Sequence, residues 1–210
     1  MIKLYYTPGS PYARIVRIVL IEKGLQDRVE CSVAQTRTPD SPYYAINPSG
    51  RVPYLVCGDG RAFEDSALIC DWLDRLDAAP RFSLQDDSGW EVRRLEALAR
   101  SMLDGLAVWV RENSRPAGER SPALIAHESG RARRLADVWE REIARPQMGG
   151  DLNLAQIVLA CTLGFAARLP QYDWRTGHPA LCAWFDAFAA RPSFVATQAP
   201  APAPASPGRT

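Results

Sequence analysis

The spacing of apolar residues changes near the start of the chain from a continuous run to a helical repeat. Residues 1–6 form a short apolar run that ends in a Thr-Pro-Gly turn, which predicts a buried strand. Residues 11–24 place apolar side chains on one face of a helix and charged side chains on the other. Ser10, Pro11 and Gly24 suit the N-cap, the first helical position and the C-cap, so they mark the ends of this helix.

Further short apolar runs predict a small mixed sheet. Residues 29–33 predict a second strand, and residues 39–46 predict a short helix or loop. Residues 52–57 and 61–63 predict two strands joined by a Gly-Asp-Gly hairpin turn, with a helix after them at 65–76. The resulting order, β-α-β-α-β-β-α, indicates an α/β domain with helices packed on the faces of one sheet.

Strand patterns stop near residue 78, and the rest of the chain has helical periodicity. Residues 90–113 and 121–145 repeat apolar side chains at helical spacing. Residues 153–169 are the most apolar and predict the buried central helix of a bundle. Residues 179–190 predict the last helix.

These patterns divide the chain into two domains. We expect an α/β domain at residues 1–78, a linker at 79–88 and an all-α domain at 89–197. Residues 198–210 are rich in proline and alanine, and we expect them to be disordered because they cannot bury a core.

Composition and charge exclude several classes of function. The chain has 210 residues, of which 47% are hydrophobic and 23% are charged, as in an ordinary globular protein. Its net charge of +1 gives no electrostatic attraction to nucleic acid or to an anionic membrane. The first residues do not form a signal peptide and no apolar run could cross a bilayer, so we expect a cytoplasmic protein with no nucleic-acid or membrane partner.

Cysteine and histidine are sparse. The five cysteines are widely spaced and form no CxxC pair, and the two histidines lie far apart in the sequence. This pattern argues against a disulfide framework and against a bound metal.

The first candidate for chemistry is Ser10, at the predicted junction of strand and helix. The free N–H groups and partial positive charge at the start of a helix stabilise an anion, and Ser10 adds a hydroxyl donor there. Read alone, Ser10 is better explained as an N-cap.

Two further segments carry groups that could bind a peptide-like ligand. A cis Val52–Pro53 bond would turn the backbone of Val52 outward to pair with an extended ligand, although an ordinary loop entering an edge strand is the simpler interpretation. A ligand carboxylate could rest on Ser66 and a ligand ammonium on Asp65 or Glu64, although helix capping is the simpler interpretation of these residues read alone.

A fourth segment lies at the head of the most apolar helix. Asn153 and Gln156 form a capping-box pattern there. We interpret this pair as a structural device, because the pattern itself stabilises the start of a helix.

The order of these segments is more specific than any one of them. The stretches SPYARIVRIVLIEKG, NPSGRVPYLV and FEDSALICDWL are followed by a helical half that contains NLAQ. In this layout the chain resembles the glutathione transferase superfamily, up to the start of the Pro/Ala-rich tail. Within that superfamily it is similar to the bacterial YibF-like branch, which shares the S-P-[aromatic] start and the N-P-x-G-[RK]-V-P segment.

The resemblance implies a thioredoxin-like N-terminal domain, an all-helical C-terminal domain and reduced glutathione as cosubstrate, with no metal. It implies that Pro53 is cis and that the backbone of Val52 pairs with the cysteinyl part of glutathione. Ser10 would be the catalytic hydroxyl that stabilises the thiolate, and a helix start can lower the pKa of a thiol. Asp65 and Ser66 would hold the γ-glutamyl end. A homodimer is also implied.

Three departures from the family pattern bear on these assignments. The family often has Glu where this chain has Asp65, and it commonly has Asp where this chain has Gln156. Ser10 in place of Cys removes the usual nucleophile of mixed-disulfide chemistry. A tyrosine-assisted site stays open as an alternative, because three tyrosines lie close by in the sequence: Tyr5, Tyr6 and Tyr12.

We expect the electrophile pocket between the two domains. Tyr12 is the best candidate for its wall, Met102, Leu106 and Trp109 are further candidates, and Arg111 could receive an anionic substrate. Most of this apolar stripe is more simply explained as bundle core. The predicted function is conjugation of glutathione to small hydrophobic electrophiles. The alternatives are a glutathione-dependent disulfide reductase or isomerase, and a non-catalytic binding or regulatory protein.

Overall fold

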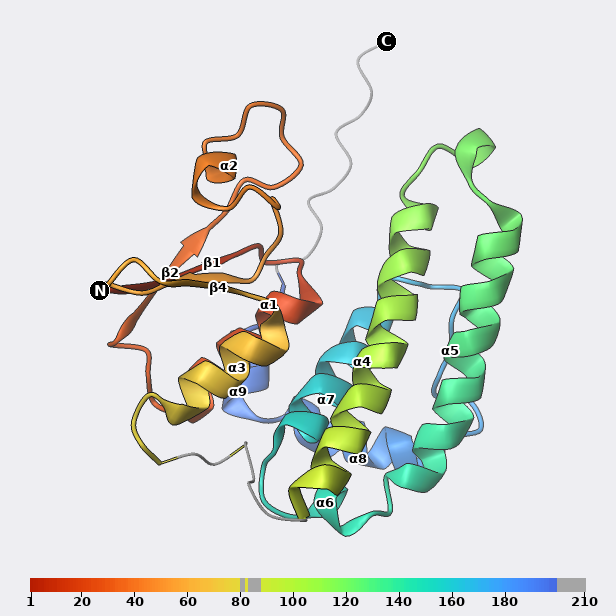
Figure 1. Cartoon of the computed structure of the whole chain (residues 1–210). Helices are drawn as coiled ribbons and strands as arrows, with labels where there is room; N and C mark the ends of the chain where they lie inside the picture. The colour runs from red at the N-terminus through yellow and green to blue at the C-terminus, as the bar shows by residue number, and fades with distance from the viewer. Residues whose placement is uncertain (80–81, 83–87, 200–210) are drawn as a thin grey trace.

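The computed structural model describes residues 1–79, 82 and 88–199, and it has a sheet-containing lobe and a helical lobe (Figure 1). The sheet-containing lobe consists of β1 (Ile2–Tyr6), α1 (Pro11–Glu22), β2 (Val29–Val33), α2 (Tyr43–Ile46), β3 (Tyr54–Val56), β4 (Ala62–Glu64) and α3 (Ser66–Arg75). The four strands form one mixed sheet in the order β2-β1-β3-β4, in which β1 and β2 are parallel and the other pairs are antiparallel. The predicted α/β topology is confirmed.

The centre of the sheet is held by apolar residues on the face that the helices cover. Leu4 of β1 pairs with Cys31 of β2 on one side and with Leu55 of β3 on the other. Leu4 and Leu55 are fully buried, because α1 and α3 pack on their face while α2 lies on the other side of the sheet (Figure 1). The parallel β1–β2 pair follows from α1, because parallel neighbours need a crossover connection.

The ends of α1 are set by local residues; its start is as predicted, but its C-cap is Lys23 and not the predicted Gly24. The side-chain oxygen of Ser10 accepts a hydrogen bond from the N–H of Ala13 at 3.2 Å, and Pro11 opens the helix. Lys23 is the C-cap, and Gly24 follows it with a φ of +64°, a conformation that favours glycine.

The helical lobe contains more elements than the sequence pattern indicated. It consists of α4 (Ser88–Asn113), a 3-10 turn (Ala117–Glu119), α5 (Pro122–Glu142), α6 (Pro146–Gly149), α7 (Leu154–Ala166), α8 (Pro179–Ala189) and α9 (Pro192–Ala196). The prediction that 179–190 forms the last helix was wrong, because Pro192 starts the further short helix α9. Both α6 and α9 are too short to produce a recognisable repeat of apolar residues.

The most apolar segment forms the central helix, as predicted. Eleven of the 13 residues of α7 are buried, and α7 packs against α4, α1 and α8. Because α7 contacts both α1 and α4, it joins the two lobes through one continuous hydrophobic core.

The start of α7 uses only half of the predicted capping box. The side-chain oxygen of Asn153 accepts a hydrogen bond from the N–H of Gln156 at 3.2 Å, as expected. The amide nitrogen of Gln156 instead donates to the carbonyl oxygens of Gln147, Gly150 and Asp151. A carboxylate could not donate these bonds, so glutamine fits the bend before α7 where aspartate would not.

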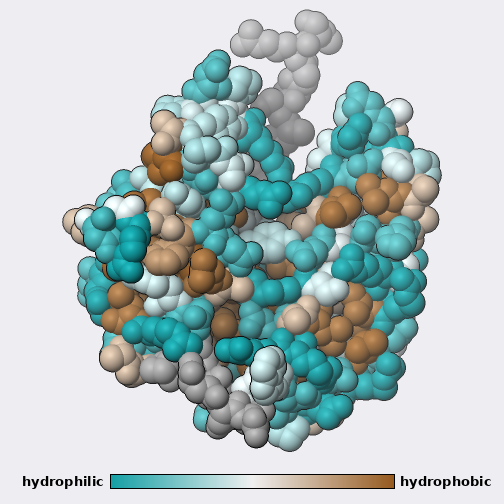
Figure 2. Space-filling model, in the orientation of Figure 1, coloured by the Kyte–Doolittle hydropathy of each residue, from teal (hydrophilic) through white to brown (hydrophobic). Residues whose placement is uncertain are grey.

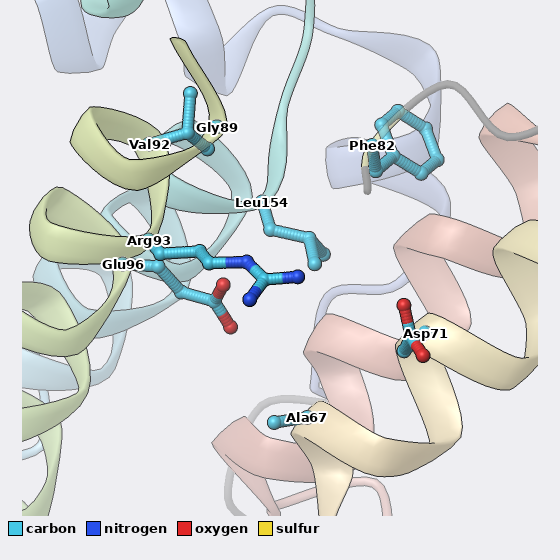
Figure 3. Close-up of a pocket in the computed structure, with 8 residues that line it drawn as sticks. All are labelled: Ala67, Asp71, Phe82, Gly89, Val92, Arg93, Glu96 and Leu154. Atoms are coloured by element: carbon cyan, nitrogen blue, oxygen red, sulfur yellow. The ribbon is translucent and has the colours of Figure 1, made fainter. Parts of the chain in front are cut away.

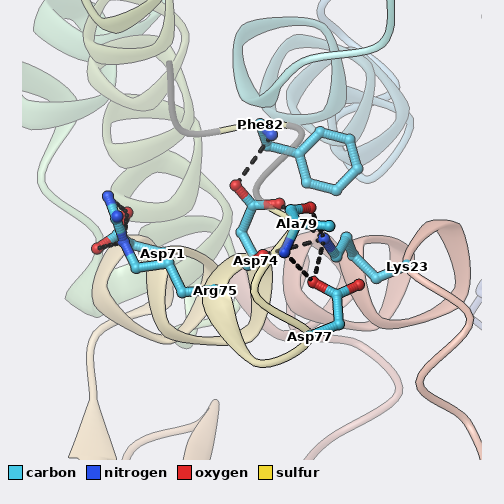
Figure 4. A network of polar contacts seen from close by, with 7 residues as sticks. All are labelled: Lys23, Asp71, Asp74, Arg75, Asp77, Ala79 and Phe82. Carbon is cyan, nitrogen blue, oxygen red and sulfur yellow. Dashed lines mark hydrogen bonds and ion pairs between the residues drawn. The ribbon is translucent and has the colours of Figure 1, made fainter. Parts of the chain in front are cut away.

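A buried ion pair holds the chain where it leaves α3 (Figure 4). The ammonium group of Lys23 lies 3.4 Å from the carboxylate of Asp74 and 2.9 Å from that of Asp77, and it donates to the carbonyl of Ala79. The other oxygen of Asp74 accepts from the N–H of Phe82 at 2.9 Å. This network fixes the chain just before the crossing to the helical lobe.

Parts of two predicted segments lie outside the described residues. Residues 80–81 and 83–87 of the predicted linker and residues 200–210 of the predicted tail are among them. Within the described part of the chain, no helix combines the length and apolarity needed to span a bilayer.

Candidate functional site

The start of α1 lies between the two lobes, in contact with α4 and with the end of α7. The hydroxyl of Tyr12 donates to Asp104 of α4, and Arg168, just after α7, donates to the carbonyl of Gly9 at 3.2 Å. In Figure 2 a notch separates the lobes at the top of the view, and hydrophilic residues cover most of its floor. We call this hollow, bordered by the start of α1, α4 and the end of α7, the interdomain cleft.

Ser10 is half-buried at the start of α1. Its oxygen accepts the hydrogen bond from Ala13, and no described residue accepts its hydroxyl hydrogen. A serine in this position can still donate one hydrogen bond to an anion, beside the partial positive charge of the helix start. The geometry therefore suits thiolate stabilisation.

The Val52–Pro53 peptide bond is cis, as the resemblance implied. The loop before it is held by the hydroxyl of Tyr43 and the side-chain amide of Asn47, which donate to the carbonyl of Arg51 at 2.6 and 3.0 Å. Val52 is half-buried and Pro53 is buried.

Asp65 and Ser66 form the start of α3. Asp65 has a φ of +79° and caps the helix by accepting from the N–H of Ala67 at 2.7 Å. A non-glycine residue in the left-handed region costs about 1–3 kcal/mol, and such strain is concentrated at ligand sites. The strain at Asp65 thus marks this corner as a candidate binding position.

Sequence reasoning missed Arg100, which reaches the same corner from the helical lobe. Its guanidinium donates to the buried hydroxyl of Ser66 at 2.8 Å and is paired with Glu96 of α4 at 2.7 Å. Arg100 is 34 residues away from Ser66 in sequence, so no local motif connects them.

The hydroxyl of Tyr12 forms its hydrogen bond with Asp104 of the helical lobe. Burial and the hydrogen bond to Asp104 raise the pKa of Tyr12 above its usual value, and the nearby charges of Arg111 and Arg100 oppose this only in part. Tyr12 therefore stays protonated and donates to Asp104, which favours Ser10 over Tyr12 as the donor to a thiolate.

The apolar residues considered for the electrophile pocket pack inside the bundle. Met102, Leu106 and Trp109 are at most 2% exposed. Asp104 and Arg111 are seven residues apart and therefore share one face of α4. Both are exposed, so this face differs from the buried one that carries Met102, Leu106 and Trp109. The side of α4 that meets Tyr12 is therefore polar.

A separate small cavity lies between α3 and the start of α4 (Figure 3). Its volume is about 170 Å³. It is lined by Ala67, Asp71, Phe82, Gly89, Val92, Arg93, Glu96 and Leu154. Neither Ser10 nor Val52 contributes to it, so it is distinct from the interdomain cleft.

No group of three or more His, Cys, Asp or Glu side chains among the described residues could hold a metal ion. The five cysteines are all free.

Two family models match the chain. The model described as glutathione S-transferase, N-terminal domain, matches residues 9–76, and the model described as glutathione S-transferase, C-terminal domain, matches residues 122–187.

Curated relatives align along almost the whole chain. The uncharacterised GST-like protein YibF of Escherichia coli K12 is 31% identical over 94% of this chain and 98% of its own length. Glutathione S-transferase 3 of Zea mays is 30% identical over 98% of this chain and 97% of its own length.

A solved structure has the same fold with a ligand in place. A glutathione transferase family member from Pseudomonas fluorescens Pf-5 with bound glutathione superposes with a TM-score of 0.87 at 31% identity, covering 96% of this chain and 100% of that one. A structure of a family member from the same strain holds S-(propanoic acid)-glutathione, with a TM-score of 0.86 at 30% identity over 95% and 100%. With both halves matched and relatives similar over their full length, this chain belongs to the glutathione S-transferase superfamily.

Proposed function

We propose that the protein is a glutathione transferase in which Ser10 stabilises the glutathione thiolate for attack on a small electrophile. The observation that carries this proposal is the hydroxyl of Ser10 at a helix start beside the interdomain cleft: its oxygen accepts from the N–H of Ala13, and no described residue accepts its hydrogen. The bound glutathione in the Pseudomonas fluorescens relative supports it.

The proposed mechanism depends on stabilising the negative charge of the glutathione thiolate. A free thiol has a pKa of about 8.5, so a minority is ionised near neutral pH. The N–H groups at the start of α1 and the Ser10 hydroxyl favour the thiolate, and the thiol proton passes to solvent. The sulfur then forms a bond to the electrophilic carbon while the leaving group departs with its bonding electron pair.

The rest of glutathione would lie across the sheet-containing lobe. We place its cysteinyl part against the backbone of Val52 beside Pro53, its ammonium at Asp65 and its γ-glutamyl carboxylate at Ser66. Arg100 supports this arrangement, because its bond to Ser66 orients the hydroxyl while Glu96 balances its charge.

Glutathione-dependent disulfide reduction is the weaker alternative. Cys70 and Cys161 are buried, and burial raises their thiol pKa values, so neither is available as a thiolate. A reductase built on this site could use neither of these two thiols.

We also propose a cytoplasmic homodimer. Leu68 and Trp90, which are 50% and 69% exposed, lie on α3 and at the start of α4, the two helices that flank the cavity of Figure 3. Two large apolar side chains on neighbouring helices support a contact with a second copy.

Binding and ionisation of glutathione test the proposal directly. Calorimetric titration of the wild-type protein with reduced glutathione should give one site per subunit. The ultraviolet absorbance of the bound thiolate, followed against pH, should give a thiol pKa at least about one unit below the free value. Ser10→Ala should remove most of that shift with little loss of affinity, and Ser10→Thr should restore it. An unchanged thiolate signal in Ser10→Ala would remove Ser10 from the mechanism.

A further inference from the structure

The side chain of Arg168 contacts the turn that precedes Ser10. Its Nη1 atom donates to the carbonyl oxygen of Gly9 at 3.2 Å. A Cβ atom placed on Gly9 would lie 3.3 Å from the same nitrogen, so the absence of a side chain at position 9 allows this close approach. The guanidinium is therefore held one residue away from the proposed thiolate site.

The charge of Arg168 is not neutralised inside the described part of the chain. No carboxylate there lies within ion-pair distance of it, and its only other close contact is the ring of Phe165, 5.7 Å from ring centroid to guanidinium carbon. The residue is exposed, and a guanidinium has five N–H donors, of which the bond to Gly9 uses one. The remaining donors are available to a ligand in the cleft.

A second cation faces the start of α1 from α4. Arg111 is exposed and has no ion pair among the described residues, and its charge acts on the hydroxyl of Tyr12. Of the neighbouring charges, Arg100 is paired with Glu96, whereas Asp104 accepts the hydrogen bond from Tyr12 and keeps its negative charge, which the two arginines outweigh. Arg168, in the turn after α7, and Arg111, on α4, thus approach the start of α1 from two sides.

We propose that the electrophile carries a carboxylate, which Arg168 binds beside the glutathione sulfur, with Arg111 as the weaker second contact. This inference rests on the proposed transferase function and names its substrate class. The polar surface of α4 and the burial of Met102, Leu106 and Trp109 favour such an acceptor over a purely apolar one.

The reaction for this class is a displacement or an addition at a carbon close to the carboxylate. With a 2-halo acid, the thiolate forms a carbon–sulfur bond, the carbon–halogen bond breaks, and halide leaves with the electron pair. Arg168 would hold the carboxylate so that the carbon next to it meets the sulfur, and it would offset the repulsion between carboxylate and thiolate.

Two glutathione thioethers that differ only in charge test the proposal. S-carboxymethylglutathione and S-carbamidomethylglutathione have similar shapes, and their affinities can be measured by calorimetry without any reaction. The wild-type protein should bind the carboxylate form about tenfold more tightly than the amide, as expected for a charge-assisted hydrogen bond. Arg168→Gln should abolish this preference, and Arg168→Lys should keep part of it.

Matched controls separate Arg168 from overall charge. Arg134→Gln removes an exposed arginine of α5, which lies on the side of α4 away from α1 (Figure 1), and it should leave the preference unchanged. Arg111→Gln should reduce the preference by a few-fold. With iodoacetate and iodoacetamide as electrophiles, the ratio of the two enzymatic rates should fall in Arg168→Gln in the same direction as the affinities.

The outcomes are distinguishable. If the wild-type protein binds reduced glutathione but does not prefer the carboxylate thioether, or if Arg168→Gln keeps the preference, the inference about Arg168 is wrong and the proposed function stands. If the protein does not bind reduced glutathione at all, the proposed function fails and this inference fails with it. If Arg168→Gln does not fold, the Arg168→Lys variant and the salt dependence of the preference decide the same question.

Discussion

The two ends of α1 differ in whether their polar groups are paired within the protein. At its C-terminal end the ammonium of Lys23 is completely buried and satisfied by Asp74, Asp77 and the carbonyl of Ala79. At its N-terminal end, within the described part of the chain, Ser10 has no acceptor for its hydroxyl hydrogen and the exposed Arg168 has no ion-pair partner. Polar groups that satisfy one another internally stabilise the fold, whereas groups left with spare donors at a cleft are available to a ligand.

The largest effect is expected at the C-terminal end of α1, on stability. Asp74→Ala leaves the buried ammonium of Lys23 with fewer partners and the N–H of Phe82 without its acceptor. Removing one partner of a buried pair costs about 3–5 kcal/mol, so the free energy of unfolding in urea should fall by about 3 kcal/mol.

Asp71→Ala is the matched control on the same helix. Its carboxylate forms an exposed pair with Arg75 at 3.0 Å (Figure 4). An exposed pair contributes up to about 1 kcal/mol, so this variant should unfold at nearly the wild-type urea concentration. Equal losses in the two variants would contradict the structural role of the buried network.

At the N-terminal end the main effect should be on rate. Ser10→Ala removes the donor to the thiolate, and loss of one such donor costs about a hundredfold or more in turnover. Stability should fall by only about 1 kcal/mol, the usual value of an N-cap. Steady-state kinetics with a chlorodinitrobenzene measure the turnover of this variant, and urea unfolding measures its stability. A loss of stability without a loss of turnover would show that Ser10 is only a helix cap.

Arg100→Met tests whether the helical lobe contributes to glutathione binding. The substitution removes the donor to Ser66 and should raise the dissociation constant for glutathione about tenfold. The pKa of the bound thiol should not change, because Ser66 lies at the γ-glutamyl end in the proposed pose. Arg100→Lys keeps the charge and should lose less, and a shifted thiol pKa in either variant would contradict this division of roles.

Tyr12→Phe should have the smallest effect. The hydrogen bond to Asp104 joins the lobes at a partly exposed position, so its loss should lower the free energy of unfolding by about 0.5–1.5 kcal/mol. Glutathione affinity and thiol pKa should stay at wild-type values. A rise in thiol pKa as large as that of Ser10→Ala would instead favour the tyrosine-assisted site.

The sequence was sufficient to predict those parts of the structure that are set by neighbouring residues. The start of α1 at Pro11 and the capping of α7 by Asn153 were predicted because the side chain and the N–H that it binds lie three residues apart. The buried α7 was predicted because its apolar composition leaves no face for water. The short helix α9 was missed because five residues are too few to show a repeat.

The candidate site could be predicted only in part, because some of its residues are distant from one another in the chain. Ser10, Val52, Asp65 and Ser66 stand in short motifs whose order resembles a known superfamily. Arg100 of α4 and Arg168 in the turn after α7 stand in no such motif, because they lie 34 and 159 residues away in the chain from the groups they contact.

The sequence by itself determined the strands, the main helices and the N-caps of α1 and α7, because each depends on spacing within one segment, and the order of the segments indicated the family. Only the tertiary structure decided which face of α4 meets the cleft and which is core. It also placed Arg168 beside Gly9, because the packing of α7 against α1 sets that distance and no pattern along the chain encodes it.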